Sequence, residues 1–208
     1  MHGRDDRRGA GPGGQDVPRL FVAVPVPPEV GEAIGRVIGE VRAALGEDGR
    51  RIRWVQLEGL HVTLRFLGPT PSDRVPLVMA ALDRAVDGEP PFEVRLADAG
   101  AFPSADRPRA LWLGILRGAD SMGRLAAALE VELRAAGWTM ETRPFRPHMT
   151  IARTDGARGG PAAAVALDRA AAGLDVGFTA ADVVLYRSHL GSGPARYEVL
   201  HRAPLARA

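Results

Sequence analysis

With 208 residues, 46% of them hydrophobic, the chain can bury a sizeable core in one large domain or two small lobes. No run approaches the roughly 18 consecutive apolar residues that a membrane span needs, and the N-terminal residues lack the hydrophobic segment of a secretory signal. Cysteine is absent, which excludes disulfide bonds and thiolate metal ligands and leads us to expect a cytoplasmic location.

The charge of the chain favours a small anionic ligand. All 27 basic residues are arginine, yet the formal net charge is only +2. Guanidinium groups stay charged at any working pH and bind phosphate oxygens in a bidentate manner. A total of +2 is too small for a long nucleic-acid groove, so we expect a small anion or a strand end as the partner.

The first 18 residues are rich in Gly, Arg and Asp, so we expect a disordered tail at 1–18 and one domain at 19–208. Apolar runs and alternation predict strands at 20–24, 52–55, 61–67, 92–101, 110–116, 138–143, 148–153, 181–189 and 195–202. Apolar spacing of three and four residues predicts helices at about 28–45, 72–87 (with Ser72 as N-cap) and 121–136, and a loop with a short helix within 154–173.

Several neighbouring strands are separated only by short turns. The strands at 52–55 and 61–67 flank a turn near Glu58-Gly59, and the last two strands form a hairpin around Gly191-Ser192-Gly193. Short connections require antiparallel pairing, so the expected fold class is α+β.

Two similar tetrapeptides stand out, His-Val-Thr-Leu at 61–64 and His-Met-Thr-Ile at 148–151. Side chains alternate between the faces of a strand, so His61 and Thr63 project together, as do His148 and Thr150. The residues between them are apolar and suit a core. Two such motifs in similar surroundings indicate two related lobes.

Two imidazoles facing each other can divide the work of acid–base catalysis, since one accepts a proton while the other donates one. Hydrolysis of a cyclic phosphodiester needs an activated water on one side of phosphorus and a protonated leaving oxygen on the other. The hydroxyls of Thr63 and Thr150 can hold non-bridging phosphate oxygens. Arg153, with Arg65 or Arg146, can neutralise the developing charge.

The chain resembles the 2H phosphoesterases, and among them the bacterial and archaeal RNA 2′,3′-cyclic phosphodiesterases, also called the 2′-5′ RNA ligase family. The segments that carry the resemblance are RLFVAVPVP, RWVQLEGLHVTLRFLG, AFPSADRPRALWLGI, RPFRPHMTIAR and VLYRSHLGSGPARYEVL. The resemblance implies a bilobal α+β fold, with two antiparallel sheets related by a pseudo-twofold axis, helices on the outer faces and a central cleft.

The resemblance also implies an enzyme that opens terminal RNA or nucleoside 2′,3′-cyclic phosphates to 2′-phosphates. Some members of the family join 2′-5′ RNA linkages reversibly. His61 and His148 would be catalytic, and Thr63, Thr150 and Arg153 would bind substrate, without a metal or other cofactor. We assign His148 to activating water and His61 to protonating the leaving 3′ oxygen, in a monomeric protein.

Other interpretations stay open from the sequence. The chain could be a non-catalytic RNA- or nucleotide-binding module, a metal hydrolase, or a phosphodiesterase for a small cyclic phosphate derived from ADP-ribose. Metal sites usually add a third histidine or a carboxylate, which neither motif supplies. Aromatic residues that could stack a base are Phe145, Tyr186 and Tyr197, whereas the histidines expected to be structural or at the surface are His2, His189 and His201.

Overall fold

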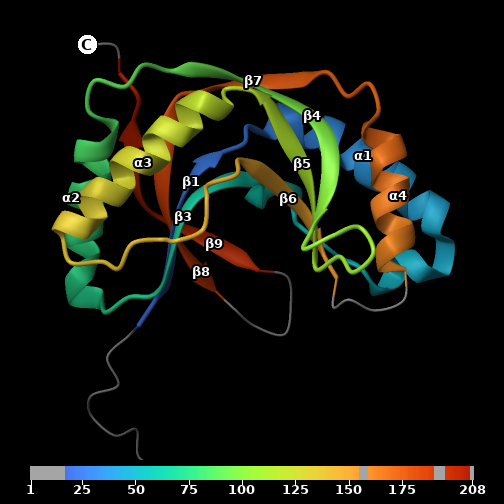
Figure 1. Ribbon diagram of the computed structural model, residues 1–208, viewed down its shortest axis with the longest axis horizontal. Coiled ribbons are helices and arrows are strands. Elements are labelled where there is room, and N and C mark those ends of the chain that lie inside the picture. The colour runs from blue at the N-terminus through green and yellow to red at the C-terminus, as the bar shows by residue number, and fades with distance from the viewer. Residues whose placement is uncertain (1–16, 155–158, 190–194, 207–208) are drawn as a thin grey trace, which may run out of the picture.

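The computed structural model describes residues 17–154, 159–189 and 195–206. Most of the predicted N-terminal tail and the predicted turn at Gly191-Ser192-Gly193 lie outside these ranges. The described residues form two antiparallel sheets, each covered by a pair of helices (Figure 1). The predicted α+β class is therefore confirmed.

The first sheet has the strand order β3-β1-β8-β9, with bounds His61–Pro69, Arg19–Pro25, Asp182–His189 and Arg196–Pro204. Helices α2 (Val75–Val86) and α3 (Ala119–Ala135) pack against each other and against this sheet. Both lie on the left in Figure 1.

The second sheet has the order β2-β6-β5-β4-β7, with bounds Arg53–Trp54, His148–Arg153, Ala110–Arg117, Phe92–Phe102 and Val176–Ala180. Helices α1 (Pro28–Leu45) and α4 (Gly160–Ala171) pack together beside it, on the right in Figure 1. Short 3₁₀ helices are η1 (Gly46–Arg51), η2 (Leu57–Gly59) and η3 (Ser72–Arg74). The two sheets contact each other along β3 and β6, the strands that carry the histidine motifs.

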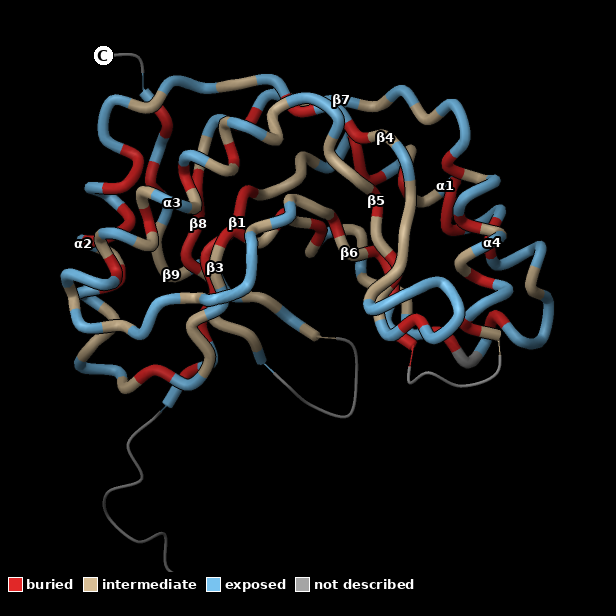
Figure 2. Tube along the Cα trace, in the orientation of Figure 1, coloured by how far each residue is buried: buried red, intermediate tan, exposed pale blue. Residues whose placement is uncertain are grey.

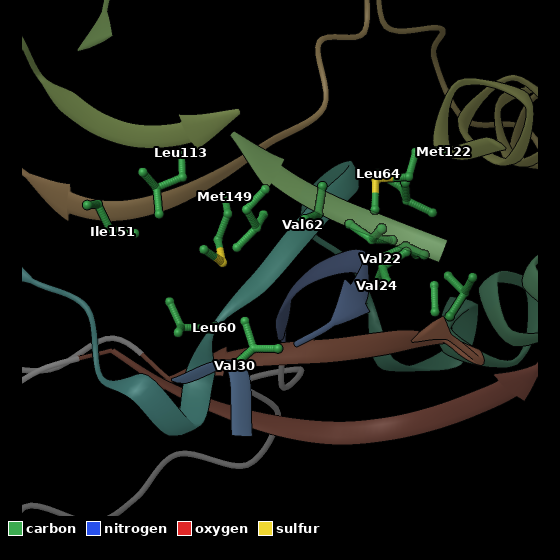
Figure 3. Packing of buried hydrophobic residues seen from close by; sticks show 14 of the residues in the cluster. Val22, Val24, Val30, Leu60, Val62, Leu64, Leu113, Met122, Met149 and Ile151 are labelled. Carbon is green, nitrogen blue, oxygen red and sulfur yellow. The ribbon is translucent and has the colours of Figure 1, made fainter. Parts of the chain in front are cut away.

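Most elements follow the apolar pattern of the sequence. Helix α1 ends where predicted, because Gly46 adopts a φ of 54° that side chains with a Cβ rarely take. Figure 2 shows buried residues along the strands and along the helix faces that meet them. In Figure 3, Val62 and Leu64 of β3 and Met149 and Ile151 of β6 belong to one buried apolar cluster.

Four expectations were wrong. Ser72 opens the 3₁₀ turn η3 and is not the N-cap of α2, which begins at Val75. Strands β2 and β3 belong to different sheets, because η2 redirects the chain and β2 pairs with β6. Residues 138–143 form no strand, since this segment is held by side chains, with Trp138 under Arg74. Strand β7 was missed, as its edge position comes from pairing with β4, which is distant in sequence.

The sheet β3-β1-β8-β9 and its helices are stabilised by the apolar face of α3. Leu129 is fully buried there, whereas Val131 on the same helix is 66% exposed. We expect Leu129→Ala to lower the free energy of unfolding by about 2–5 kcal/mol, because it removes buried methyl groups and leaves a cavity. Val131→Ala, the matched control, should stay within about 0.5 kcal/mol. Urea unfolding measures both, and equal losses in the two variants would contradict this account of the core.

Candidate active site

The histidine motifs occupy the start of two strands that meet between the sheets. In β3 and β6 the first and third residues are half-buried, and the second and fourth are buried in the core. His61 and Thr63 therefore share one face of β3, and His148 and Thr150 share one face of β6, as predicted from the alternation. The apolar residues between them anchor both strands (Figure 3).

Each imidazole is held by an equivalent hydrogen bond to a backbone carbonyl. Nδ1 of His61 donates to the carbonyl oxygen of Gly59 at 2.7 Å, and Nδ1 of His148 donates to the carbonyl oxygen of Arg146 at 2.7 Å. A carbonyl can only accept, so the neutral ring carries its proton on Nδ1. In both histidines Nε2 is then the nitrogen left to accept or donate a proton.

Aromatic rings fix the planes of both imidazoles. The His61 ring lies 4.8 Å from the centroid of Phe21 and 5.1 Å from that of Tyr197, which it meets edge-on. The His148 ring lies 4.9 Å from the centroid of Phe102, again edge-on. These rings come from strands of both sheets and restrict rotation of the imidazoles, so that Nε2 is preorganised.

The electrostatics of the two rings are linked. Burial lowers the pKa of His61 and of His148, and the hydrogen bond to each carbonyl opposes that shift. The charge of Arg153 lowers both pKa values further, and the charge of His148 lowers the pKa of His61. Charges act in this way only at short range. The structure thus brings together three residues predicted for the site, His61, His148 and Arg153.

A β-bulge decides where Arg153 points. In the pairing of β5 with β6, Trp112 lies opposite Thr150 and Leu111 opposite Ala152, so Ile151 is an extra residue. After the bulge Arg153 lies opposite Ala110, which is on the same face as Trp112 and Thr150. Without it, a spacing of five residues from His148 would send Arg153 to the core face.

The same irregularity occurs in β3. Thr63 lies opposite Ala23 and Arg65 opposite Val22, so Leu64 is the extra residue and Phe66 returns to the face of the histidine. Phe66 therefore takes the place in the first motif that Arg153 takes in the second. Its side chain is 55% exposed, and its ring centroid is 5.9 Å from that of Phe21. Sequence reasoning missed this residue, although both follow their histidines by five positions.

A small cavity adjoins Phe66. Its volume is about 300 Å³. It is lined by residues of β3 and of the connection between α3 and β6, namely Arg65, Phe66, Leu67, Trp138, Thr139, Met140 and Glu141. A larger cavity of about 620 Å³ lies between α1 and α4, away from both motifs. The smaller cavity borders the histidine face at Phe66 alone, since Arg65 lies on the opposite face of β3.

Of the two arginines suggested to assist Arg153 in charge neutralisation, Arg65 is placed elsewhere by the structure. Arg65 faces away from the histidines, where Nε lies 2.9 Å from the carboxylate of Glu130 and one NH₂ group donates to the carbonyl of Thr139 at 2.5 Å. The bulge at Leu64 turns it to that face. Arg146 contributes its carbonyl to His148, while its side chain is exposed. Of the two alternatives suggested to join Arg153, Arg65 is therefore held in an ion pair away from the histidine face.

The structure also places the other histidines and the aromatic residues that were considered for base stacking. His189 lies 2.8 Å from Glu198 on the neighbouring strand, and His201 lies 2.6 Å from Asp83 of α2. His2 lies outside the described residues. Tyr186 and Tyr197 surround His61 with Phe21, whereas Phe145 packs against the core.

Two further properties concern only the part of the chain that the structure describes. There, no group of three or more His, Asp or Glu side chains is placed to hold a metal ion. Within the same ranges, no helix combines the length and apolar character needed to cross a membrane.

Comparison with known proteins identifies the family. Residues 26–192 match the family described as the 2′-5′ RNA ligase superfamily. An RNA 2′,3′-cyclic phosphodiesterase of Aeropyrum pernix is 35% identical over 129 residues, which cover 62% of this chain and 72% of that protein. One of Geobacillus stearothermophilus is 31% identical over 185 residues, which cover 89% of this chain. The chain spans only 56% of the length of the Geobacillus protein.

Comparison with solved structures supports the same family. The crystal structure of Escherichia coli LigT complexed with 3′-AMP superposes with a TM-score of 0.70 at 26% identity, covering 92% of this chain and 100% of that one. The paired sheets, the motif strands and the matched residues thus lead to one assignment: the chain belongs to the 2′-5′ RNA ligase superfamily.

Proposed function

We propose that this protein hydrolyses terminal RNA 2′,3′-cyclic phosphates to 2′-phosphates by acid–base catalysis with His61 and His148. The observation that carries the proposal is the pair of imidazoles with equivalent Nδ1–carbonyl bonds, both within the field of Arg153. The names of the Aeropyrum and Geobacillus relatives support the substrate class. Because acid and base are both side chains, the mechanism requires no metal or other cofactor.

The proposed reaction proceeds in line at phosphorus. Nε2 of His148 takes a proton from water as its oxygen attacks phosphorus. The bond from phosphorus to the 3′ oxygen breaks, and Nε2 of His61 gives its proton to that oxygen, which leaves a 2′-phosphate. Thr63 and Thr150 donate hydrogen bonds to the non-bridging oxygens, and Arg153 offsets their charge.

The same arrangement supports ligation. If a 5′ hydroxyl of a second strand replaces water, attack with loss of the 3′ oxygen forms a 2′-5′ phosphodiester. By microscopic reversibility the two histidines exchange roles when that linkage is cleaved. We further propose that the protein acts as a cytoplasmic monomer with one catalytic domain at 19–208.

The terminal base is proposed to lie on Phe66. An aromatic ring that is 55% exposed on the histidine face offers a surface on which a base of a single-stranded nucleic acid can stack. Stacking places no demand on base identity, so all four RNA bases should bind there, with purines held more tightly because their rings overlap more.

The central experiment incubates the protein with nucleoside 2′,3′-cyclic phosphates, a cyclic-phosphate-ended oligoribonucleotide and an ADP-ribose-derived cyclic phosphate, with EDTA present. We expect the RNA-type substrates to give 2′-phosphates, identified by ³¹P NMR. His61→Ala and His148→Ala should each lower kcat by roughly 10²–10⁴-fold, because each removes one proton transfer. His189→Ala, the matched control, should retain activity. Saturable binding without product would favour a binding module, and loss of activity in EDTA would favour a metal enzyme.

A sulfur-substituted substrate distinguishes the proposed roles of the two histidines. Replacing the 3′ oxygen by sulfur gives a leaving group with a pKa of about 8.5, which departs without a proton donor. On this substrate His61→Ala should regain most of its lost rate, and His148→Ala should not. Recovery by His148→Ala instead would reverse the assignment of acid and base.

The pH dependence follows from the lowered pKa values. One histidine must be neutral and the other protonated, so kcat/KM should follow a bell centred between their pKa values in the free enzyme. Both lie below the ordinary value of 6.5, and the maximum should therefore lie below pH 6.5. A bound phosphate anion stabilises the imidazolium, so the bell for kcat should shift to higher pH. A kcat/KM maximum above pH 7 would contradict the electrostatic account.

Replacing Phe66 tests the base position. Phe66→Ala should raise KM for nucleoside 2′,3′-cyclic phosphates by roughly five- to hundredfold, corresponding to the 1–3 kcal/mol of a base–aromatic stack, with a smaller effect on kcat. Leu77→Ala, which changes another exposed apolar side chain on α2, serves as control. An unchanged KM in Phe66→Ala would show that the base lies elsewhere.

A further inference from the structure

A second arginine lies beside Arg153. We propose that Arg53 of β2 forms a subsite for a backbone phosphate of the RNA strand, next to the place of the reacting phosphate at Arg153. The inference rests on the proposed function and extends it, since it makes an RNA end a better substrate than a mononucleotide.

Strand pairing sets the position of Arg53. In the antiparallel pair of β2 with β6, Arg53 lies directly opposite Arg153 and Trp54 lies opposite Ala152. Directly opposed residues project from the same face, with their backbones one strand spacing of about 4.8 Å apart. Ala152 is buried and Trp54 packs against the core, so Arg53 and Arg153 both project from the other face, which is that of His148.

The charges on this face are unbalanced. Like charges directly opposite each other in a sheet are destabilising, and within the described ranges neither Arg53 nor Arg153 forms an ion pair. Several arginines on other strands do have acidic partners. Arg117 lies 2.7 Å from Glu93, and Arg202 lies 2.7 Å from Asp182. An anion lying across Arg53 and Arg153 would remove the repulsion.

Phosphate is the anion that fits this face best. A planar guanidinium binds two phosphate oxygens at once, and a cation would be repelled by two such groups. Arg153 already acts on both histidines, so a strand whose terminal phosphate lies between them passes Arg53 at the edge of the sheet. Strand β2 has only two residues and lies at that edge, where Arg53 is exposed to an approaching chain.

The test compares Arg53→Met on two substrates, a nucleoside 2′,3′-cyclic phosphate and a cyclic-phosphate-ended oligoribonucleotide. We expect kcat/KM for the oligonucleotide to fall roughly three- to tenfold, mainly through KM, because one charge-assisted contact to a surface phosphate is lost. The nucleoside should be hydrolysed within about twofold of the wild-type rate. The slope of log kcat/KM against log salt for the oligonucleotide should shrink by about 0.7, the value for one phosphate on a single strand.

Two variants act as controls. Arg36→Met removes an exposed arginine from α1 and should leave the rates and the salt slope unchanged. Arg53→Lys keeps the charge and should retain the salt slope while losing the bidentate contact. Equal losses on nucleoside and oligonucleotide, or no loss on either, would overturn the subsite.

A binding measurement tests the phosphate subsite independently of the proposed activity. Fluorescence anisotropy with a 2′-phosphate-ended oligonucleotide and with the matching nucleoside 2′-phosphate needs no turnover. If the wild-type protein hydrolyses neither cyclic substrate, yet Arg53→Met weakens binding of the oligonucleotide alone, the proposed activity fails and the subsite stands. If the variant binds the oligonucleotide as tightly as wild type, the subsite is refuted whatever the activity.

Discussion

The hydrogen bond from each Nδ1 to the carbonyl two residues earlier is the constraint on which the site depends. It is made twice with the same length, by His61 to Gly59 and by His148 to Arg146. Because the acceptor is part of the backbone entering the strand, the tautomer of each ring is set by local geometry and needs no carboxylate partner. Nε2 is then the nitrogen of each ring that is left to accept or donate a proton, and the aromatic neighbours hold it in place.

The two motif strands share a backbone design and differ in chemistry. Each has an extra residue after the threonine, Leu64 in β3 and Ile151 in β6, and each bulge returns the residue five positions after the histidine to the histidine face. That residue is an aromatic ring, Phe66, in one lobe and a guanidinium, Arg153, in the other. Two similar strands thereby offer different groups to the proposed substrate, a ring for its base on one side and guanidinium groups for its phosphates on the other.

How far the sequence could predict this arrangement depends on the range of the interactions. Alternation within β3 and β6 is local, so the common face of each histidine and threonine could be read directly, as could the helices with a clear apolar stripe. Pairing between distant segments was not encoded locally, which explains the wrong partner for β2 and the missed β7. The bulges depend on register against β1 and β5, so the orientation of Arg65 could not be foreseen.

Electrostatic coupling between the two imidazoles affects how many protons the pair carries. Burial and Arg153 disfavour any imidazolium in the free protein, while a bound phosphate anion favours one. The charge of His148 lowers the pKa of His61, so protonation of one ring opposes protonation of the other. In the proposed mechanism, a substrate anion therefore brings the pair to a state with one proton, which is the state that general acid–base catalysis needs. Since that state serves attack by water and by a ribose hydroxyl alike, the electrostatics favour neither hydrolysis nor ligation, and the choice falls to whichever nucleophile occupies the site.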